Sequence, residues 1–208
     1  ASLEIESDGG NATVELSGTA TQSGLPKFKL TAIDASDSDA FGNSVSIDGD
    51  YAIVGALGED DNGSAAGAAY IFVRNGSTWV EQAKLVAGDS EPYDNFGYSV
   101  SINGNCAVVG SIADDDGGYS SGSVYVFVRN GSTWVEQAKL TASDGESYDN
   151  FGYSVSISGN TVLVGAYHDD DGGDDSGSAY VFVYDGQNWT EQTKLTIDAA
   201  ATLDYFGI

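Results

Sequence analysis

The fold is decided by the stretch Phe96–Leu140, which reads FGYSVSINGNCAVVGSIADDDGGYSSGSVYVFVRNGSTWVEQAKL. It predicts four short strands separated by Gly-containing turns. The first and last strands alternate apolar and polar residues, which is typical of strands with two different faces. The two central strands are continuous apolar or β-branched runs, which belong to strands covered on both faces. The predicted strands are Phe96–Ile102, Cys106–Ser111, Ser123–Val128 and Trp134–Leu140.

This pattern recurs every 55 residues along the chain. The positions that mark the period are Phe41, Phe96, Phe151 and Phe206, each followed by Gly, and Trp79, Trp134 and Trp189. Four antiparallel strands with a doubly covered centre describe a β-propeller blade packed between two neighbours. A β-sandwich does not predict identical spacing three times, and a helical solenoid is excluded by the missing 3.6-residue period. We therefore expect an all-β fold of propeller blades, with repeats at about 31–85, 86–140 and 141–195 and a partial blade at 196–208.

The first part of the chain, residues 1–24, does not fit the repeat. Two alternating stretches, Leu3–Glu6 and Thr13–Leu16, flank the turn residues Asp8–Asn11, and this predicts a β-hairpin. The hairpin resembles the last strands of bacterial immunoglobulin-like surface domains. Leu25–Leu30 then mirrors the fourth strand of a repeat, so the repeat segment is expected to cover 25–208.

Composition excludes several classes of protein. The 208 residues carry 32 acidic and 7 basic side chains, a formal charge of −25, which excludes binding to nucleic acid or to an anionic membrane. Hydrophobic residues make up 41%, so the chain is expected to fold rather than form an acidic disordered tail. No apolar run approaches the roughly 20 residues of a membrane span. The single cysteine, Cys106, excludes a disulfide framework and is expected to be a small buried residue where other repeats have Tyr51 and Thr161.

The order FG-x-SVSI, then VGA or VGS, an Asp-rich loop and G-S-x-YVF resembles the FG-GAP repeat of integrin α-subunit propellers, in its bacterial multi-copy form. The resemblance implies an extracellular or cell-surface propeller used for adhesion or ligand binding, often with bound calcium. In integrin-type repeats the calcium loop joins the first and second strands. Here that connection is only Asp48–Asp50, Asn103–Asn105 or Ser158–Asn160, which is too short to wrap an ion.

The acidic side chains instead gather in two other connections. Because successive turns of an up-and-down blade alternate between its ends, loops two-three and four-one are expected on one face of the ring. These loops hold 20 of the 26 acidic residues between positions 31 and 195. The candidate calcium ligands in loop two-three are Glu59, Asp60, Asp61, Asp114, Asp115, Asp116, Asp169, Asp170, Asp171, Asp174 and Asp175; those in loop four-one are Asp89, Asp94, Asp144 and Asp149.

Two interpretations of these carboxylates remain open. Ca²⁺ prefers six to eight oxygen ligands, which clustered Asp side chains supply, and neighbouring acids without a cation repel each other. Alternatively, Asp, Asn and Gly simply make good turns on a soluble surface. The spacing of the acids is not that of an EF-hand.

Other candidate residues carry less information. Tyr93, Tyr98, Tyr148 and Tyr153 flank Phe-Gly near the acidic face, where they either contact a sugar or protein ligand or simply pack. The only histidine, His168, has no counterpart in the other repeats and is expected on an exposed loop. No Ser-His-Asp order and no phosphate loop with Gly-Lys-Ser/Thr is present, so we expect no enzyme activity.

Three blades are too few to close a ring, for which four to eight is usual. An open stack exposes apolar blade faces and strand edges. We therefore expect either that these blades are part of a longer propeller or that several copies complete one another, as a homo-oligomer, as a fibre or through strand addition by the N-terminal hairpin. The expected ligand is a surface or matrix protein or a polysaccharide. A start at Ala1 rather than Met is typical of a processed protein or of part of a longer one.

Overall fold

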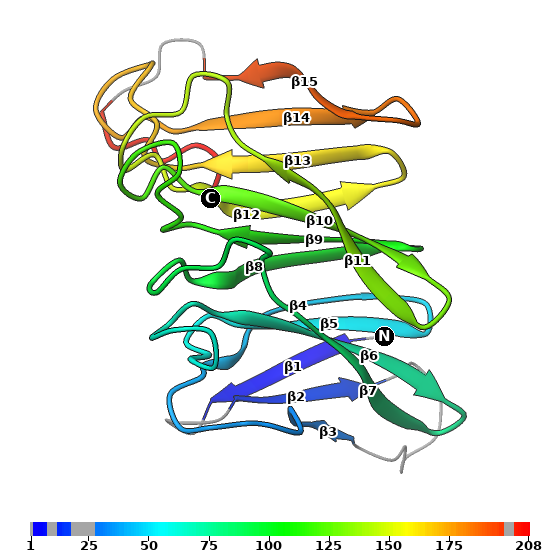
Figure 1. The fold of residues 1–208 in the computed structure, drawn as a ribbon. Helices are drawn as coiled ribbons and strands as arrows, with labels where there is room; N and C mark the ends of the chain where they lie inside the picture. The colour runs from blue at the N-terminus through cyan, green and yellow to red at the C-terminus, as the bar shows by residue number, and fades with distance from the viewer. Residues whose placement is uncertain (1, 8–11, 18–27, 198–201) are drawn as a thin grey trace.

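The computed structural model describes residues 2–7, 12–17, 28–197 and 202–208, which form an all-β structure (Figure 1). Three four-stranded antiparallel sheets follow each other along the chain, each in the order of its sequence. This confirms the predicted division into three repeats. The strands are β4 (Phe41–Asp48), β5 (Tyr51–Ala56), β6 (Ala68–Asn75) and β7 (Thr78–Leu85); β8 (Phe96–Asn103), β9 (Cys106–Ser111), β10 (Ser123–Asn130) and β11 (Thr133–Leu140); β12 (Phe151–Ser158), β13 (Thr161–Ala166), β14 (Ser178–Tyr184) and β15 (Trp189–Leu195).

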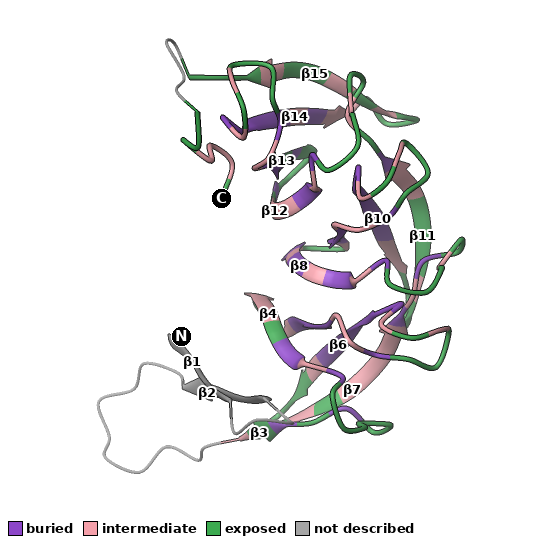
Figure 2. Ribbon diagram, turned by 90° about the vertical axis from the view of Figure 1, so that its left-hand side faces the viewer, coloured by how far each residue is buried: buried purple, intermediate pink, exposed green. Residues whose placement is uncertain are grey.

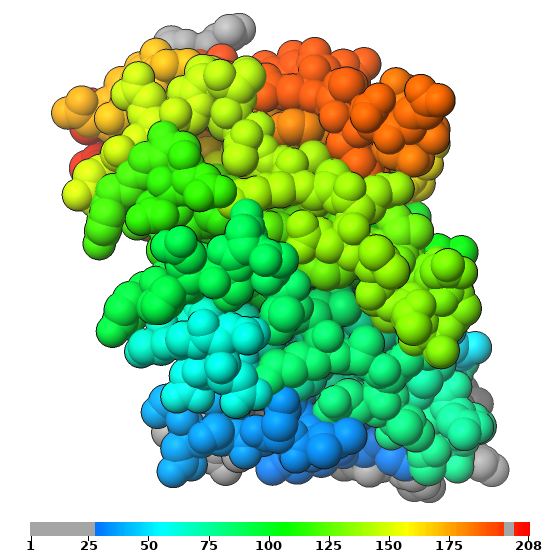
Figure 3. Space-filling model, viewed as in Figure 1, coloured from blue at the N-terminus to red at the C-terminus, as the bar shows by residue number. Residues whose placement is uncertain are grey.

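The three sheets stand as blades along an arc that is open on one side (Figure 2). The first strand of each blade lies on the inside of the arc and the fourth on the outside, so the fold is that of propeller blades. Bands of colour in the space-filling view follow the order of the chain, because each repeat packs mainly on its sequence neighbours (Figure 3). In the part of the chain that the structure describes, no helix is long and apolar enough to cross a membrane.

The Phe-Gly pairs lock each blade to the one before it. Phe96 is fully buried, and its ring makes edge-to-face contacts with Tyr125 and Phe127 of its own blade at centroid distances of 5.4 and 6.0 Å. Its backbone N–H donates to Ala66 O of the preceding repeat at 3.0 Å. A Cβ added at Gly110 would lie 2.2 Å from the carbonyl oxygen of Gly152 in the following blade. Close backbone approach between blades therefore requires glycine at this position of strand two.

The two ends of the chain hold incomplete blades. At the N-terminus, β1 (Ser2–Ser7) and β2 (Ala12–Ser17) form the predicted hairpin, and β2 pairs with β3 (Lys29–Leu30). The predicted turn at Asp8–Asn11 lies outside the described residues, as do residues 25–27 of the expected strand Leu25–Leu30. That strand is shorter than expected, since Phe28 is not part of it. At the C-terminus, Phe206 forms a single parallel bridge with Gly177.

Candidate functional site

The loops that carry the acids lie together at one end of the blades (Figure 1). Backbone hydrogen bonds join loop two-three of one repeat to the next loop four-one, for example Tyr93 N to Ser64 O and Tyr148 N to Tyr119 O, both at 2.8 Å. We call this surface the acidic rim; it consists of residues 31–40, 57–67, 86–95, 112–122, 141–150 and 167–177.

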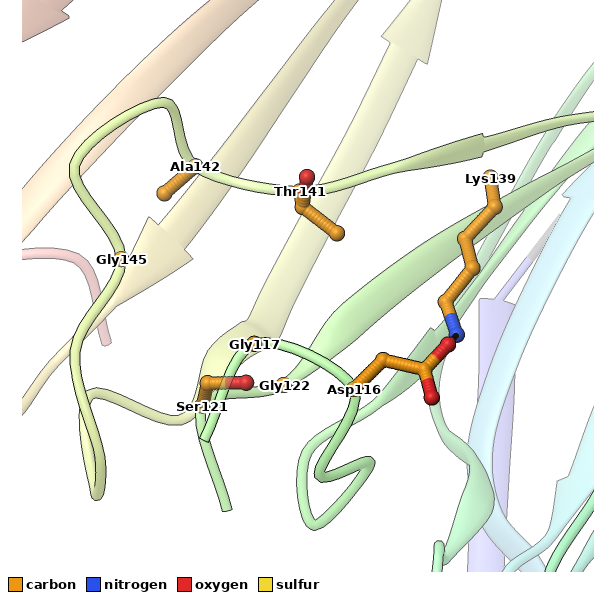
Figure 4. Close-up of a pocket in the computed structure, with 8 residues that line it drawn as sticks. All are labelled: Asp116, Gly117, Ser121, Gly122, Lys139, Thr141, Ala142 and Gly145. Carbon is orange, nitrogen blue, oxygen red and sulfur yellow. Dashed lines mark hydrogen bonds and ion pairs between the residues drawn. The ribbon is translucent and has the colours of Figure 1, made fainter. Parts of the chain in front are cut away.

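In each repeat a lysine of the fourth strand reaches the acidic rim and contacts three carboxylates. Lys139 Nζ lies 2.8 Å from Asp89, 2.8 Å from Asp114 and 2.6 Å from Asp116. Figure 4 shows the lysine extended toward Asp116. The equivalent lysine clusters are Lys84 with Asp34, Glu59 and Asp61, and Lys194 with Asp144, Asp169 and Asp171. A cation supplied by the chain itself thus sits among the predicted ligands of each repeat.

One acid of each lysine cluster is buried and held by several donors. The Asp169 side chain is only 4% exposed. It accepts hydrogen bonds from Tyr180 Oη at 2.7 Å, Ser178 Oγ at 2.8 Å and Lys194 Nζ at 2.8 Å. Burial alone opposes ionisation of this carboxyl, but the hydrogen bonds from Lys194, Tyr180 and Ser178 hold its pKa below the usual value. Asp169 is therefore a structural anion that the fold has already satisfied.

The first repeat departs from this arrangement. Glu59 replaces the buried aspartate, and Ala68 stands where the later repeats have Ser123 and Ser178. Glu59 Oε1 contacts Lys84, whereas the buried Oε2 has no hydrogen-bond partner among the described residues. The cluster of the first repeat consequently has an acceptor left over for water or an ion.

The expected calcium ligands Asp94 and Asp149 do not join a lysine cluster. Both are 5% exposed, and each accepts a backbone hydrogen bond at 2.7 Å, from Glu91 N and Glu146 N respectively. Burial, together with the nearby charge of another rim acid, raises the pKa of each to about 6. Their local role is to hold the turn before the Phe-Gly strand.

The remaining acids face solvent at the outer side of the rim, apart from Asp175, which is half-buried. Among the residues that the structure describes, two groups bring carboxylate oxygens within 4.8 Å of one another: Glu59, Asp60 and Asp61, and Asp89, Asp114 and Asp116. The donor chemistry fits a hard cation such as Ca²⁺. The lysine of each cluster occupies the inner side, so an ion has to bind from the solvent side. The other outward acids are Asp115, Asp170, Asp171 and Asp174.

The four expected ligand-contact tyrosines separate into two kinds. Tyr93 and Tyr148 are 65% and 62% exposed on the acidic rim. Tyr98 and Tyr153 are half-buried and stack with ring centroids 5.0 Å apart, so they belong to the packing between blades. Tyr119 is 64% exposed and lies 5.2 Å from the Tyr148 ring. It has no equivalent tyrosine in the other repeats, which is why the repeat pattern did not indicate it.

The expectation of an exposed loop histidine is wrong. His168 is half-buried, its ring lies 3.7 Å from that of Tyr167, and its Nδ1 is 3.0 Å from Asn150 Oδ1. Packing on the aromatic side chain covers it. It belongs to none of the lysine clusters.

Sequence reasoning missed the lysines and Asp34. Their signal was present, because Lys84, Lys139 and Lys194 recur at the same 55-residue step as the acids. The period did not show that the lysine side chain crosses from the fourth strand to loop two-three.

A family model matches the three repeats. The family model described as "FG-GAP repeat" matches residues 27–72, 79–127 and 134–182, and the chain belongs to this family. No curated protein matches the chain. Among solved structures, the crystal structure of Saccharomyces cerevisiae Sqt1 is similar, with 12% sequence identity and a TM-score of 0.48. That match covers 78% of this chain, which spans 37% of the yeast protein.

Proposed function

We propose that the protein is a non-enzymatic binding and adhesion module of a secreted or cell-surface protein, of bacterial origin, whose acidic rim contacts its ligand with the help of Ca²⁺. The observation that carries this proposal is the threefold recurrence of one carboxylate cluster on a single rim. Family membership supports a binding module at the level of its fold class. The ligand class is a surface or matrix protein or a polysaccharide.

Charge at the rim favours a cationic or ion-bridged contact. Each cluster has three acids and one lysine, which leaves an excess of two negative charges when all are ionised. Repeated along one rim, this excess produces a field that concentrates cations. A divalent ion bound there neutralises the excess and leaves coordination positions for oxygen atoms of a ligand.

The lysine limits the affinity for the ion. An ammonium and a divalent ion 4 Å apart repel by about 8 kcal/mol at an effective dielectric of 20, although salt and the outer position of the ion reduce this. We therefore expect weak calcium binding, in the range of extracellular modules at about 10⁻⁴ to 10⁻³ M. The first repeat, with its spare Glu59 oxygen, is the strongest of the three sites.

Calorimetric titration with CaCl₂ tests the proposal, using the EDTA-treated chain. The wild type should release or take up heat and gain thermal stability, and Asp60→Asn with Asp61→Asn should weaken binding at least threefold. Lys84→Gln should strengthen it, because the competing ammonium is gone. Absence of heat from both wild type and Lys84→Gln would mean that these are plain solvated loops.

A second candidate function is self-assembly. It is favoured by the face of the third blade that points away from the second blade. Leu195 is 41% exposed, whereas its equivalents Leu85 and Leu140 are 3% and 4% exposed beneath the next blade. Leu163 is 42% exposed, although Ile53 and Val108 at the same position are fully buried. The occupant we assign to this face is a second copy of the chain, since a ring needs more blades than three.

Sedimentation velocity distinguishes the two functions. Wild type should sediment with an apparent mass above the 21.5 kDa of one chain, and the Leu163→Asp variant should sediment with the mass of one chain. Val135→Asp, exposed on the outer strand β11, is the matched control and should leave the association unchanged. A wild-type monomer at high concentration would remove self-assembly and leave the binding module.

A further inference from the structure

A groove of about 440 Å³ lies at the opposite end of the blades from the acidic rim. It opens between the second and third blades, beside the hairpin turns that join β8 to β9 and β12 to β13. The residues that matter for its chemistry are Asn105, Cys106, Gln137, Asn160, Tyr184 and Trp189. It shares no residue with the acidic rim.

The side chains that line the groove differ in part from those of the preceding repeat. Between the first and second blades the equivalent place holds the ring of Tyr51. That ring makes an edge-to-face contact with Trp134 at 6.3 Å, and the Arg129 guanidinium lies 4.3 Å from its centroid. One repeat later Cys106 replaces the tyrosine. The tryptophan of the next outer strand, Trp189, is retained, whereas Tyr184 replaces Arg129. The ring that stands over this place in the preceding repeat is therefore absent, and a different ring borders the groove.

The walls of the groove are preorganised. Trp189 Nε1 donates to Gln137 Oε1 at 3.0 Å, and Gln137 Nε2 donates to Tyr184 Oη at 3.3 Å. The tyrosine and tryptophan rings are 5.2 Å apart and inclined by 33°, which presents an aromatic surface. Because Tyr184 accepts from the glutamine, its hydroxyl proton remains directed to a further acceptor.

Amide groups complete the set of polar atoms. Asn105 Oδ1 accepts from Arg129 Nη2, which leaves its Nδ2 group to donate elsewhere. Asn160 contributes a second exposed carboxamide. Asn105, Gln137, Asn160 and Trp189 carry no titratable group, and burial raises the pKa of the Cys106 thiol to about 11.

We propose that this groove binds a neutral hexopyranose unit of a saccharide, whose ring takes the place that Tyr51 fills in the preceding repeat. An aromatic wall packs against the C–H face of such a ring, and uncharged amides and a phenol match its hydroxyl groups. An anionic sugar is disfavoured by the net charge of −25. This site does not depend on calcium or on the acidic rim.

Nuclear magnetic resonance on the ¹⁵N-labelled chain tests the site, with D-glucose, D-galactose, D-mannose and their β-linked or α-linked tetramers as probes. At least one probe should shift the Trp189 indole Nε1–H and the Gln137 side-chain amide. A small ligand of this kind is expected to bind with a dissociation constant of about 1 mM. The indole of Trp134 provides the internal control, because Tyr51 already fills the equivalent place.

Three variants sharpen the result. Cys106→Tyr restores the filling seen in the first repeat and should lower the affinity at least tenfold, whereas Cys106→Ser should change it less than twofold. Gln137→Ala, on the exposed outer strand, should weaken binding at least threefold and covers the case in which Cys106→Tyr does not fold.

The proposal is overturned if no probe shifts the Trp189 indole signal at a concentration 50 times the expected dissociation constant. It is also overturned if Cys106→Tyr binds the probe as well as wild type does. Phenol is the remaining probe. If phenol shifts this indole and no sugar does, the groove takes an aromatic ring and the saccharide assignment is wrong. Calcium titration of the same samples is independent, so failure at either site is distinguishable from failure at the other.

Discussion

Replacing Lys194 with methionine removes the cation of the third lysine cluster while keeping a side chain of similar length. The change leaves the Asp169 carboxylate, 4% exposed, without its ammonium partner. Asp144 and Asp171 lose the same partner but are 42% and 63% exposed, so water replaces the contact. We expect the buried partner to determine nearly the whole effect.

The expected loss of unfolding free energy follows from this difference between the buried and the exposed partners. Removing one member of a buried ion pair costs about 3–5 kcal/mol, and each exposed pair contributes about 0–1 kcal/mol. Asp169 retains its hydrogen bonds from Tyr180 and Ser178, so we take the lower end, about 3 kcal/mol. In a domain of this size that corresponds to a fall in Tm of about 6–12 °C.

Urea unfolding followed by tryptophan fluorescence measures the free energy, since Trp189 lies on the same strand, β15. Thr190→Met, an exposed position of that strand, is the matched control and should change the free energy by less than about 0.5 kcal/mol.

The pH dependence has a definite sign. The pKa of Asp169 is lowered in the folded state, so its stabilisation is present above the unfolded value of about 3.9 and disappears as pH falls through the folded value. The difference between wild type and Lys194→Met should therefore be constant from pH 5 to 8 and shrink below about pH 4. A loss below 1 kcal/mol at pH 7, or a loss unchanged at pH 3, would refute a buried ion pair as the cause.

Two further predictions concern single residues, one on the acidic rim and one on a central strand. Asp149→Asn should raise Tm above pH 6, because the folded-state pKa of about 6 means that the ionised carboxyl destabilises the fold there. This gain in Tm should vanish near pH 4. A variant less stable than wild type at pH 7.5 would contradict the prediction. Gly110→Ala should destabilise the chain by about 3 kcal/mol or more, because the new Cβ meets Gly152 O at 2.2 Å. Gly104→Ala, with nothing within 4 Å, should cost only about 1 kcal/mol for its positive φ, and equal losses in urea unfolding would exclude blade contact as the reason.

The strands of the repeat could be predicted from the chain because they depend on local patterns that are repeated. Phe96, Cys106, Ser123 and Trp134 each lie at or within one residue of a strand start. Alternation of turns also placed loops two-three and four-one on one face, since antiparallel strands leave no other arrangement. The hairpin of residues 1–24 was predicted from alternation, whereas its likeness to an immunoglobulin-like domain stays a prediction.

The candidate site could be predicted only in part, because its geometry joins residues of different loops. Acids of one run, such as Asp114 and Asp116, look alike in sequence, yet one is buried and the other exposed. That difference arises because a strand end turns the first acid inward, toward Tyr125 and Lys139.

The blade, its period and the charge of the rim follow from residue types repeated at a constant step, so the chain alone was enough to predict them. The packing of distant segments was needed to show that Lys139 neutralises part of that charge and that a groove lies between Cys106 and Trp189. The physical reason is that both features arise where two segments pack together. Whether a carboxylate or a ring is covered depends on what the neighbouring segment places against it.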